Sequence, residues 1–152
     1  MNVPADPLSS LEVVTVPPEL PLEAAHRIMM DRALRHLPVV SGQKLAGILS
    51  ERDLLLAIGR AKDGHFVYPR LTVGEVMSLA PVSAGPNVPV VELARTMVDA
   101  KLDAIPVVSP QNVLIGLVTA SDLLRLLTWL PSEGLPSLQF QVRLASELQA
   151  RA

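Results

Sequence analysis

The chain repeats itself, and this internal duplication limits its possible folds more than any other feature. The segment Leu37–Ser41 (LPVVS) recurs as Ile105–Ser109 (IPVVS). The same offset aligns further identical residues before these segments: Pro21 with Pro89, Arg27 with Arg95, Met29 with Met97, Asp31 with Asp99 and Leu34 with Leu102. After one inserted residue in the second turn, Gly47 aligns with Gly116 and Asp53 with Asp122. Self-similarity of this kind indicates two copies of one structural unit.

Both copies predict the same order of elements, β-α-β-β-α. Apolar residues at helical spacing indicate the helices, and a proline near a strand start tolerates its missing N–H group. The first copy predicts an extended stretch at Val13–Val16, helices at Leu22–Arg35 and Glu51–Arg60, a strand led by Pro38, and a strand at Leu45–Leu49. The second predicts an extended stretch at Val82–Ala84, helices at Val90–Leu102 and Ala120–Leu130, a strand led by Pro106, and a strand at Leu114–Val118.

The expected fold class is α+β (mixed α/β), with two β-α-β-β-α repeats packed as a pseudo-twofold pair. The strands are nearly continuous apolar runs, which indicates sheet covered on both faces. Neither copy alone easily buries its apolar faces, whereas two copies packed together do. The expected boundaries are residues 1–66 for the first repeat, 67–131 for the second and 132–152 for a C-terminal tail. Ala61–Leu71 is interpreted as a linker, Thr72–Ser78 as the start of the second copy, and Leu138–Ala150 as a terminal helix.

Composition excludes several classes of protein. The longest apolar run, Leu123–Leu130, is far shorter than the roughly 20 residues of a membrane span. There is no cysteine, so disulfides and thiolate chemistry are excluded. The net charge of −2 and 3% aromatic residues argue against nucleic-acid binding. Met1–Ser10 does not resemble a secretory signal, so a cytoplasmic location is expected. His26, His36 and His65 lack the spacing of metal ligands.

The repeated motifs resemble the CBS (cystathionine β-synthase-type) domain. In the first copy LPVV is followed by GILSERDL, and in the second IPVV is followed by GLVTASDL. Thr72–Ser78 (TVGEVMS) also resembles the opening of the family pattern, and the resemblance covers about Leu8–Leu130. It implies a two-repeat protein with two clefts between the repeats. Clefts of this family commonly hold AMP, ADP, ATP or S-adenosyl compounds.

Ser50 and Thr119 end a strand and open a helix in each copy, and Asp53 and Asp122 follow three residues later. A carboxylate has two acceptor oxygens and can accept both hydroxyls of a ribose. The Ser50 and Thr119 hydroxyls, together with the helix-start N–H groups, can face a phosphate. The same spacing also describes a capping box that only stabilises the helix start. Both interpretations remain open, and the family resemblance favours ribose binding.

The resemblance also implies unequal clefts. Family members often meet phosphates with the residues just before the Pro-Val-Val strand, which are Arg35 and His36 in the first copy and Asp103 and Ala104 in the second. Arg52 of the first copy corresponds to Ser121 of the second. We therefore expect a phosphorylated nucleotide at Asp53, and a less anionic ligand or none at Asp122. The alternative for Arg35 and His36 is a solvated helix end, where a cation favours the dipole.

Each cleft is also expected to be lined in part by residues from the first strand of the other repeat. The resemblance places Ser78 and Val82 at the Asp53 cleft and Ser10 and Val14 at the Asp122 cleft. The expected function is a regulatory module with no catalytic residues, no metal and no catalytic cofactor. Its expected partners are an adenine nucleotide, a second copy in a homodimer and a regulated protein, without membrane insertion. The alternative is a protein-interaction scaffold with vestigial clefts, and an enzyme is a remote third.

Overall fold

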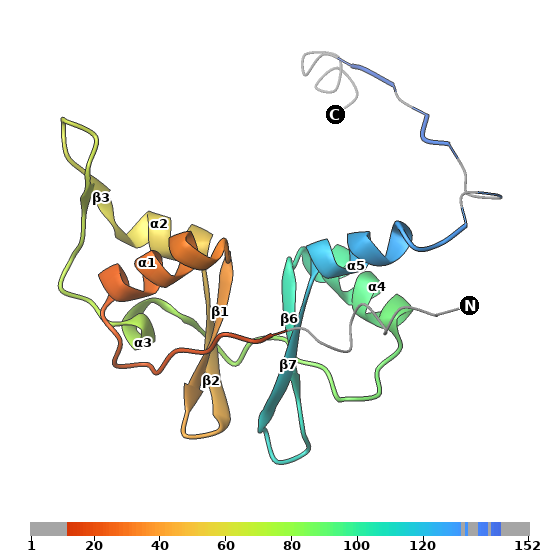
Figure 1. Cartoon of the computed structure of the whole chain (residues 1–152), viewed down its shortest axis with the longest axis horizontal. Coiled ribbons are helices and arrows are strands. Elements are labelled where there is room, and N and C mark those ends of the chain that lie inside the picture. Colours follow the sequence, from red (N-terminus) through yellow and green to blue (C-terminus); the bar gives the residue numbers. More distant parts are fainter. Residues whose placement is uncertain (1–11, 132, 134–136, 140, 144–152) are drawn as a thin grey trace, which may run out of the picture.

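Each copy of the repeat folds into a helix, an antiparallel hairpin and a second helix. In the first copy these are α1 (Leu22–Arg32), β1 (His36–Ser41), β2 (Lys44–Ser50) and α2 (Glu51–Ala57). In the second they are α4 (Val90–Ala100), β6 (Ala104–Val108), β7 (Leu114–Thr119) and α5 (Ala120–Leu127). The computed structural model describes residues 12–131, 133, 137–139 and 141–143, and Figure 1 shows the two hairpins beside each other at the centre with the helix pairs to either side. The predicted α+β architecture of two repeats is confirmed.

The long helices α1 and α4 end earlier than their apolar periodicity predicts. Each begins after a proline in extended conformation, Pro21 or Pro89. Each ends at a residue in the left-handed conformation, Ala33 with φ 52° or Lys101 with φ 54°. A left-handed residue reverses the chain and closes the helix C-terminus through its own N–H group. The predicted ends at Arg35 and Leu102 were therefore wrong, because the residues after the reversal already lead into the strands.

The two hairpins have the same register and the same irregularity. His36 pairs with Ser50 in the first, and Ala104 pairs with Thr119 in the second. Both registers shift at one place, after Val39 and after Val107. The predicted leading strands shrink to single parallel bridges, Val16 to Val39 and Ala84 to Val107. The equivalence of these details confirms the duplication at the level of individual backbone pairs.

Hairpin tips join the two copies. The Leu45 N–H donates to the Asn112 carbonyl at 3.0 Å, and the Leu114 N–H donates to the Gln43 carbonyl at 3.1 Å. The Asn112 side-chain amide donates to the Leu45 carbonyl at 3.0 Å. These bonds extend antiparallel pairing from one copy into the other, around the bridge between Lys44 and Val113. The copies are therefore joined by hydrogen bonds between their hairpin tips.

The segment expected to open the second copy packs on the first. It forms α3 (Val73–Val76) and β5 (Ser78–Leu79). Val73 is fully buried in the first core, and β5 pairs antiparallel with β2. Pairing is close here, since a Cβ on Gly47 would lie 2.7 Å from both the Met77 sulfur and the Ser78 carbonyl oxygen. The chain therefore completes the core and the sheet of the first copy before it continues into the second.

The expected linker is partly structured. Gly59–Arg60 forms β3 and Phe66–Val67 forms β4, and the two strands pair as a hairpin. The predicted continuation of α2 to Arg60 was therefore wrong. His26 is 3% exposed; its Nδ1 lies 2.7 Å from the Tyr68 hydroxyl and its ring meets Phe66 edge-on. These aromatic contacts tie the segment to α1, so His26 has a packing role.

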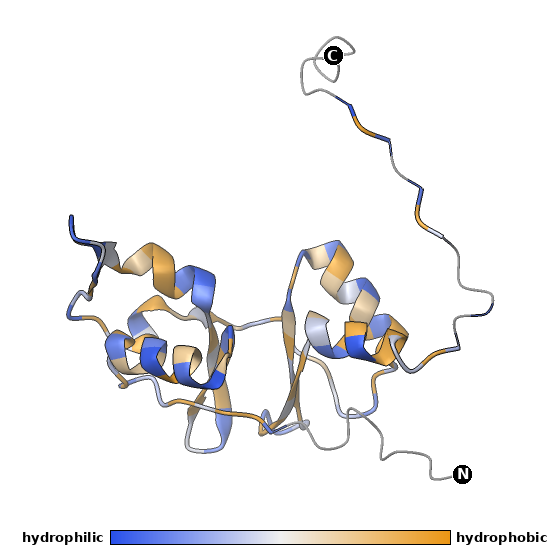
Figure 2. Ribbon diagram, turned by 45° about the horizontal axis from the view of Figure 1, so that its top comes forward, coloured by the Kyte–Doolittle hydropathy of each residue, from blue (hydrophilic) through white to orange (hydrophobic). Residues whose placement is uncertain are grey.

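Among the residues that the structure describes, the two cores differ in size. Nine buried apolar residues form the first: Val16, Leu22, Ala25, Met29, Leu37, Val39, Leu49, Leu54 and Val73. The second contains three, Leu93, Met97 and Ile105. Apolar residues of α4 and α5 stay exposed, including Val98 at 75% and Leu124 at 62%, and Figure 2 shows hydrophobic and hydrophilic residues alternating along these helices. The second helix pair thus presents an apolar surface to its surroundings.

The predicted terminal helix falls mainly on residues outside those described, and positions 137–139 and 141–143 are not helical. Among the helices that the structure describes, none combines the length and apolarity of a membrane span.

The close approach of β5 to β2 at Gly47 can be tested by comparing equivalent glycine substitutions in the two copies. Gly47→Ala should destabilise the protein by about 1–3 kcal/mol, because the added methyl group overlaps the Met77 side chain and the Ser78 backbone. Gly116→Ala should change stability by less than about 0.5 kcal/mol, since its Cβ would meet only Val107 at 3.8 Å. Urea unfolding of the two variants measures the difference. Equal losses would show that the close approach of β5 to β2 does not limit the fold.

Candidate functional site

A cavity of about 380 Å³ lies where the first copy meets the second. We call it the first cavity. Seven residues singled out in the sequence line it: Arg35, His36, Ser50, Arg52, Asp53, Ser78 and Val82. Sequence reasoning missed five others: Ile48, Glu51, Pro81, Lys101 and Leu102. It assigned Asp103 and Ala104 to the second copy's phosphate position, whereas both line this first cavity. The structure thus gathers every residue expected at the Asp53 cleft, and their role in binding stays a prediction.

A second cavity of about 260 Å³ surrounds Asp122. Four of the residues expected there line it, Val14, Thr119, Ser121 and Asp122, whereas Ser10 lies outside the described residues. The lining also includes Glu12, Val13, Ala33, Leu34, Arg35, His36, Asp103, Leu117 and Arg125. The two cavities are related by the duplication, since Leu117, Thr119 and Ser121 stand where the first has Ile48, Ser50 and Arg52.

Each cavity joins the strand–helix junction of one copy to the helix end of the other. The first combines residues 48–53 with residues 101–104, and the second combines residues 117–125 with residues 33–36. The left-handed residues Ala33 and Lys101 create this arrangement, because each turns the chain out of its helix and against the opposite copy. Neither copy could form such a cavity alone.

The prediction that Arg35 and His36 distinguish the two cavities was wrong. Arg35 and His36 line both cavities, and so does Asp103. These residues therefore cannot by themselves make one cavity more attractive to phosphate than the other. Three other differences in cationic residues remain: Arg52 against Ser121, Lys101 against Ala33, and Arg125, which lines the second cavity while its counterpart Leu56 does not line the first. The second was available from the sequence, because the repeat offset aligns Lys101 with Ala33.

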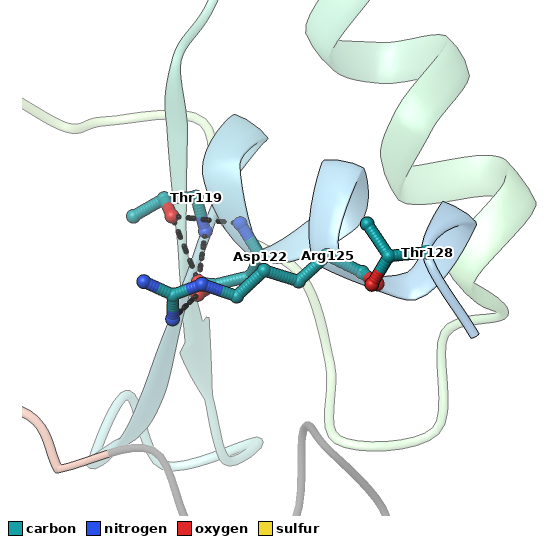
Figure 3. A network of polar contacts seen from close by, with 4 residues as sticks. All are labelled: Thr119, Asp122, Arg125 and Thr128. Atoms are coloured by element: carbon teal, nitrogen blue, oxygen red, sulfur yellow. Dashed lines mark hydrogen bonds and ion pairs between the residues drawn. The ribbon is translucent and has the colours of Figure 1, made fainter.

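At Asp122 the capping-box interpretation is correct. Its carboxylate accepts hydrogen bonds from the Thr119 N–H and the Thr119 hydroxyl, both at 2.8 Å. The Asp122 N–H donates back to the Thr119 hydroxyl at 3.3 Å, and Arg125 lies 3.7 Å from the other carboxylate oxygen (Figure 3). Asp122 is buried, with 7% of its surface exposed. Thr119 thus occupies one carboxylate oxygen of Asp122 with two hydrogen bonds, and the other oxygen has a longer ion pair with Arg125.

At Asp53 only half of that motif forms. The Ser50 hydroxyl caps α2 by accepting from the Asp53 N–H at 3.0 Å. Within residues 12–131 the Asp53 carboxylate takes part in no hydrogen bond or ion pair of its own. Two acceptor oxygens are therefore available toward the first cavity. Identical spacing in the two copies yields a satisfied carboxylate in one and an available one in the other.

Burial lowers the pKa of His36, and the neighbouring Arg35 guanidinium adds to this effect. Asp103, Asp53 and Glu51 oppose it by favouring the charged imidazolium, but burial is the largest cause. Because the lowered pKa lies below the ordinary 6.5, the imidazole is mainly neutral at pH 7. His36 therefore offers hydrogen bonds to the cavities rather than a fixed positive charge.

Both cavities offer groups suited to noncovalent binding. Cations, carboxylates and hydroxyls stand beside apolar walls, which are Ile48 and Val82 in the first cavity and Val14 and Leu117 in the second. In the part of the chain that the structure describes, no three His, Asp or Glu side chains cluster as metal ligands. A ligand with an apolar ring, vicinal hydroxyls and an anionic group would satisfy all three kinds of surface.

Comparison with known proteins finds the same duplication. The CBS domain family model matches residues 7–60 and 73–128. Inosine-5′-monophosphate dehydrogenase of Korarchaeum cryptofilum is 38% identical over 111 residues, which cover 73% of this chain. The chain spans only 21% of the length of that relative. The similarity therefore concerns one part of the relative.

Two solved structures share the arrangement. The CBS domain pair of protein MJ0100, in complex with 5′-methylthioadenosine and S-adenosyl-L-methionine, is 26% identical with a TM-score of 0.68, covering 80% of this chain and 93% of that one. The cytosolic domain of the Mg²⁺ channel MgtE, in complex with ATP, is 29% identical with a TM-score of 0.61, covering 75% of this chain and 44% of that one.

The different states of the two aspartates predict different stabilities. Asp122→Ala should lower the free energy of unfolding by roughly 1–2 kcal/mol, because it removes the reciprocal cap of α5. Asp53→Ala should change it by less than about 0.5 kcal/mol, since the Ser50 cap persists without the carboxylate. Chemical unfolding of the ligand-free protein at pH 7 compares them. A larger loss in Asp53→Ala would contradict the assignment of the capping box to the second copy.

Proposed function

The chain belongs to the CBS domain family, with two repeats, and from this premise we propose that it is a non-catalytic, cytoplasmic module that binds an adenine nucleotide and senses its level. The observation that carries the proposal is the first cavity. It combines an available Asp53 carboxylate with the Arg35 and Arg52 guanidinium groups and an apolar wall. The adenine-containing ligands named for the MJ0100 and MgtE structures support the same class of ligand.

The proposed pose assigns each part of the nucleotide to one surface. The two ribose hydroxyls donate to Asp53, whose two oxygens suit a vicinal diol. The phosphates meet Arg35 and Arg52, because guanidinium groups form strong charge-assisted hydrogen bonds with phosphate. The adenine ring lies against Ile48 and Val82, where its burial is favourable. AMP, ADP and ATP share these features, so the proposal names the class.

The second cavity is proposed to take a less anionic adenosine derivative or to stay empty. A ribose there would have to compete with Thr119 and Arg125 for the Asp122 oxygens. That exchange is unfavourable unless the ligand replaces the hydrogen bonds it breaks. The S-adenosyl class, which carries no phosphate, is the candidate ligand for this cavity.

Ligand binding would change how the two copies are positioned relative to each other. Each cavity is built from both copies, so a bound ligand contacts both and favours the arrangement that forms the cavity. A ligand that changes this arrangement would change the outer helix surfaces. We propose that a regulated partner protein responds to that change.

The second candidate is a protein-interaction scaffold with vestigial cavities. The satisfied Asp122 favours it, because a cavity that no longer binds ligand can lock its carboxylate into a helix cap. The two functions differ in one respect that is simple to measure. A sensor is stabilised by its ligand, and a scaffold is not.

Thermal unfolding of ligand-free protein with AMP, ADP, ATP, S-adenosylmethionine or NAD tests the sensor. A ligand that binds only the folded state adds about 2.7 kcal/mol at a hundredfold excess over its dissociation constant. The expected result is a rise in Tm with at least one adenine nucleotide, lost in Asp53→Ala and kept in Gly116→Ala as the matched control. No rise with any ligand would leave the scaffold as the better function.

We further propose a homodimer formed through the exposed apolar residues of α5 and the turn after it. Leu124, Leu127 and Trp129 are between 51% and 62% exposed. Burying such a surface in water is favourable by about 25 cal/mol per Å² before the costs of association. Light scattering at micromolar concentration should give twice the chain mass, and Leu124→Glu with Leu127→Glu should give the monomer. A monomeric mass for the unaltered protein would contradict the dimer.

A further inference from the structure

Lys101 and Ala33 occupy the same place in the two copies with different side chains. Both follow a long helix in the left-handed conformation, Lys101 with φ 54° and ψ 47° and Ala33 with φ 52° and ψ 43°. Lys101 lines the first cavity, and Ala33 lines the second. The backbone geometry is the same, so only the side chain distinguishes the two positions.

The lysine at position 101 changes the net charge of the residues that line the first cavity. The first is lined by Arg35, Arg52 and Lys101 and by three carboxylates, Glu51, Asp53 and Asp103. The second is lined by Arg35 and Arg125 and also by three carboxylates, Glu12, Asp103 and Asp122. The first cavity is therefore balanced, whereas the second carries one excess negative charge. Without Lys101, the first cavity would have the same excess negative charge as the second.

The position of Lys101 does not by itself require a lysine. A cation is favourable near a helix C-terminus, but the identical turn after α1 forms with alanine. A left-handed backbone favours glycine, and both copies place another residue there. Helix termination therefore does not require this lysine, and Lys101 lines the first cavity from the second copy, whereas Arg35 and Arg52 line it from the first.

We propose that Lys101 is a specificity-determining residue that makes the first cavity select phosphorylated over unphosphorylated adenine ligands. The proposal rests on the proposed function, because it names what distinguishes the ligands of that site. The Lys101 ammonium pairs with the phosphate from the side opposite Arg35 and Arg52. The second cavity, with Ala33 at the matching position, keeps its negative charge and disfavours phosphate.

Exchanging the two side chains tests this. Isothermal titration with ADP and with adenosine is carried out on the unaltered protein, on Lys101→Ala and on Lys62→Ala, which removes an exposed lysine outside both cavities. Lys101→Ala should weaken ADP binding about five- to tenfold while adenosine binding changes less than about twofold. Lys62→Ala should leave both affinities unchanged. Equal affinities for ADP in Lys101→Ala and the unaltered protein would overturn the proposal.

The reciprocal substitution places a lysine at the second cavity, in a variant whose first cavity no longer has the Asp53 carboxylate. In an Asp53→Ala background, Ala33→Lys should strengthen ADP binding to the second cavity about five- to tenfold and leave adenosine binding unchanged. An unchanged ADP affinity would show that a lysine at this position does not govern phosphate selection.

A final variant separates binding from folding. Lys101→Gly relieves the left-handed backbone, so its Tm should rise while its ADP affinity falls as in Lys101→Ala. Equal losses for ADP and adenosine, together with a lower Tm, would assign Lys101 a structural role and overturn the proposal. If the unaltered protein binds neither ADP nor adenosine, the proposed function itself fails, which is a distinct outcome.

Discussion

The structure depends on the left-handed turn that ends each long helix. Ala33 and Lys101 close α1 and α4 through hydrogen bonds from their own N–H groups. The residues that follow leave the helix axis and enter β1 and β6, and on the way they form a wall of the cavity that belongs to the opposite copy. A helix that continued for three more residues would remove this wall. The turn thus links helix termination, hairpin placement and cavity formation.

Duplication produced two cavities of one design with different chemistry. Thr119 and Asp122 cap each other reciprocally, while Ser50 caps α2 and Asp53 stays available. Such divergence is physically simple, because a carboxylate three residues after a hydroxyl can either bond to the helix start or face outward. The first choice contributes to stability and the second leaves acceptors for a ligand. One site of the pair is accordingly suited to binding and the other to holding its helix.

Sequence periodicity predicted the elements well and their ends poorly. The order of helices and strands, the hairpin partners and the duplication all follow from apolar spacing and the repeated motif. The end of α1 at Arg32 does not, since a left-handed alanine carries no compositional signal. Nor does the β3–β4 hairpin, because two-residue strands are too short for a periodic pattern and are fixed by the packing of Phe66 and Tyr68 around His26.

The sequence by itself determined that there are two units, that each contains a helix, a hairpin and a second helix, and which residue types reach the strand–helix junctions. Only the tertiary structure decided which of the two cavities each of these residues lines. Arg35 and His36 lie between the cavities and line both, and Lys101 faces the junction of the other copy. The physical reason is that spacing along a chain records local geometry, whereas a shared wall arises from how two copies pack. The state of Asp53 and Asp122 was likewise decided in three dimensions, because one motif permits both a helix cap and an open acceptor.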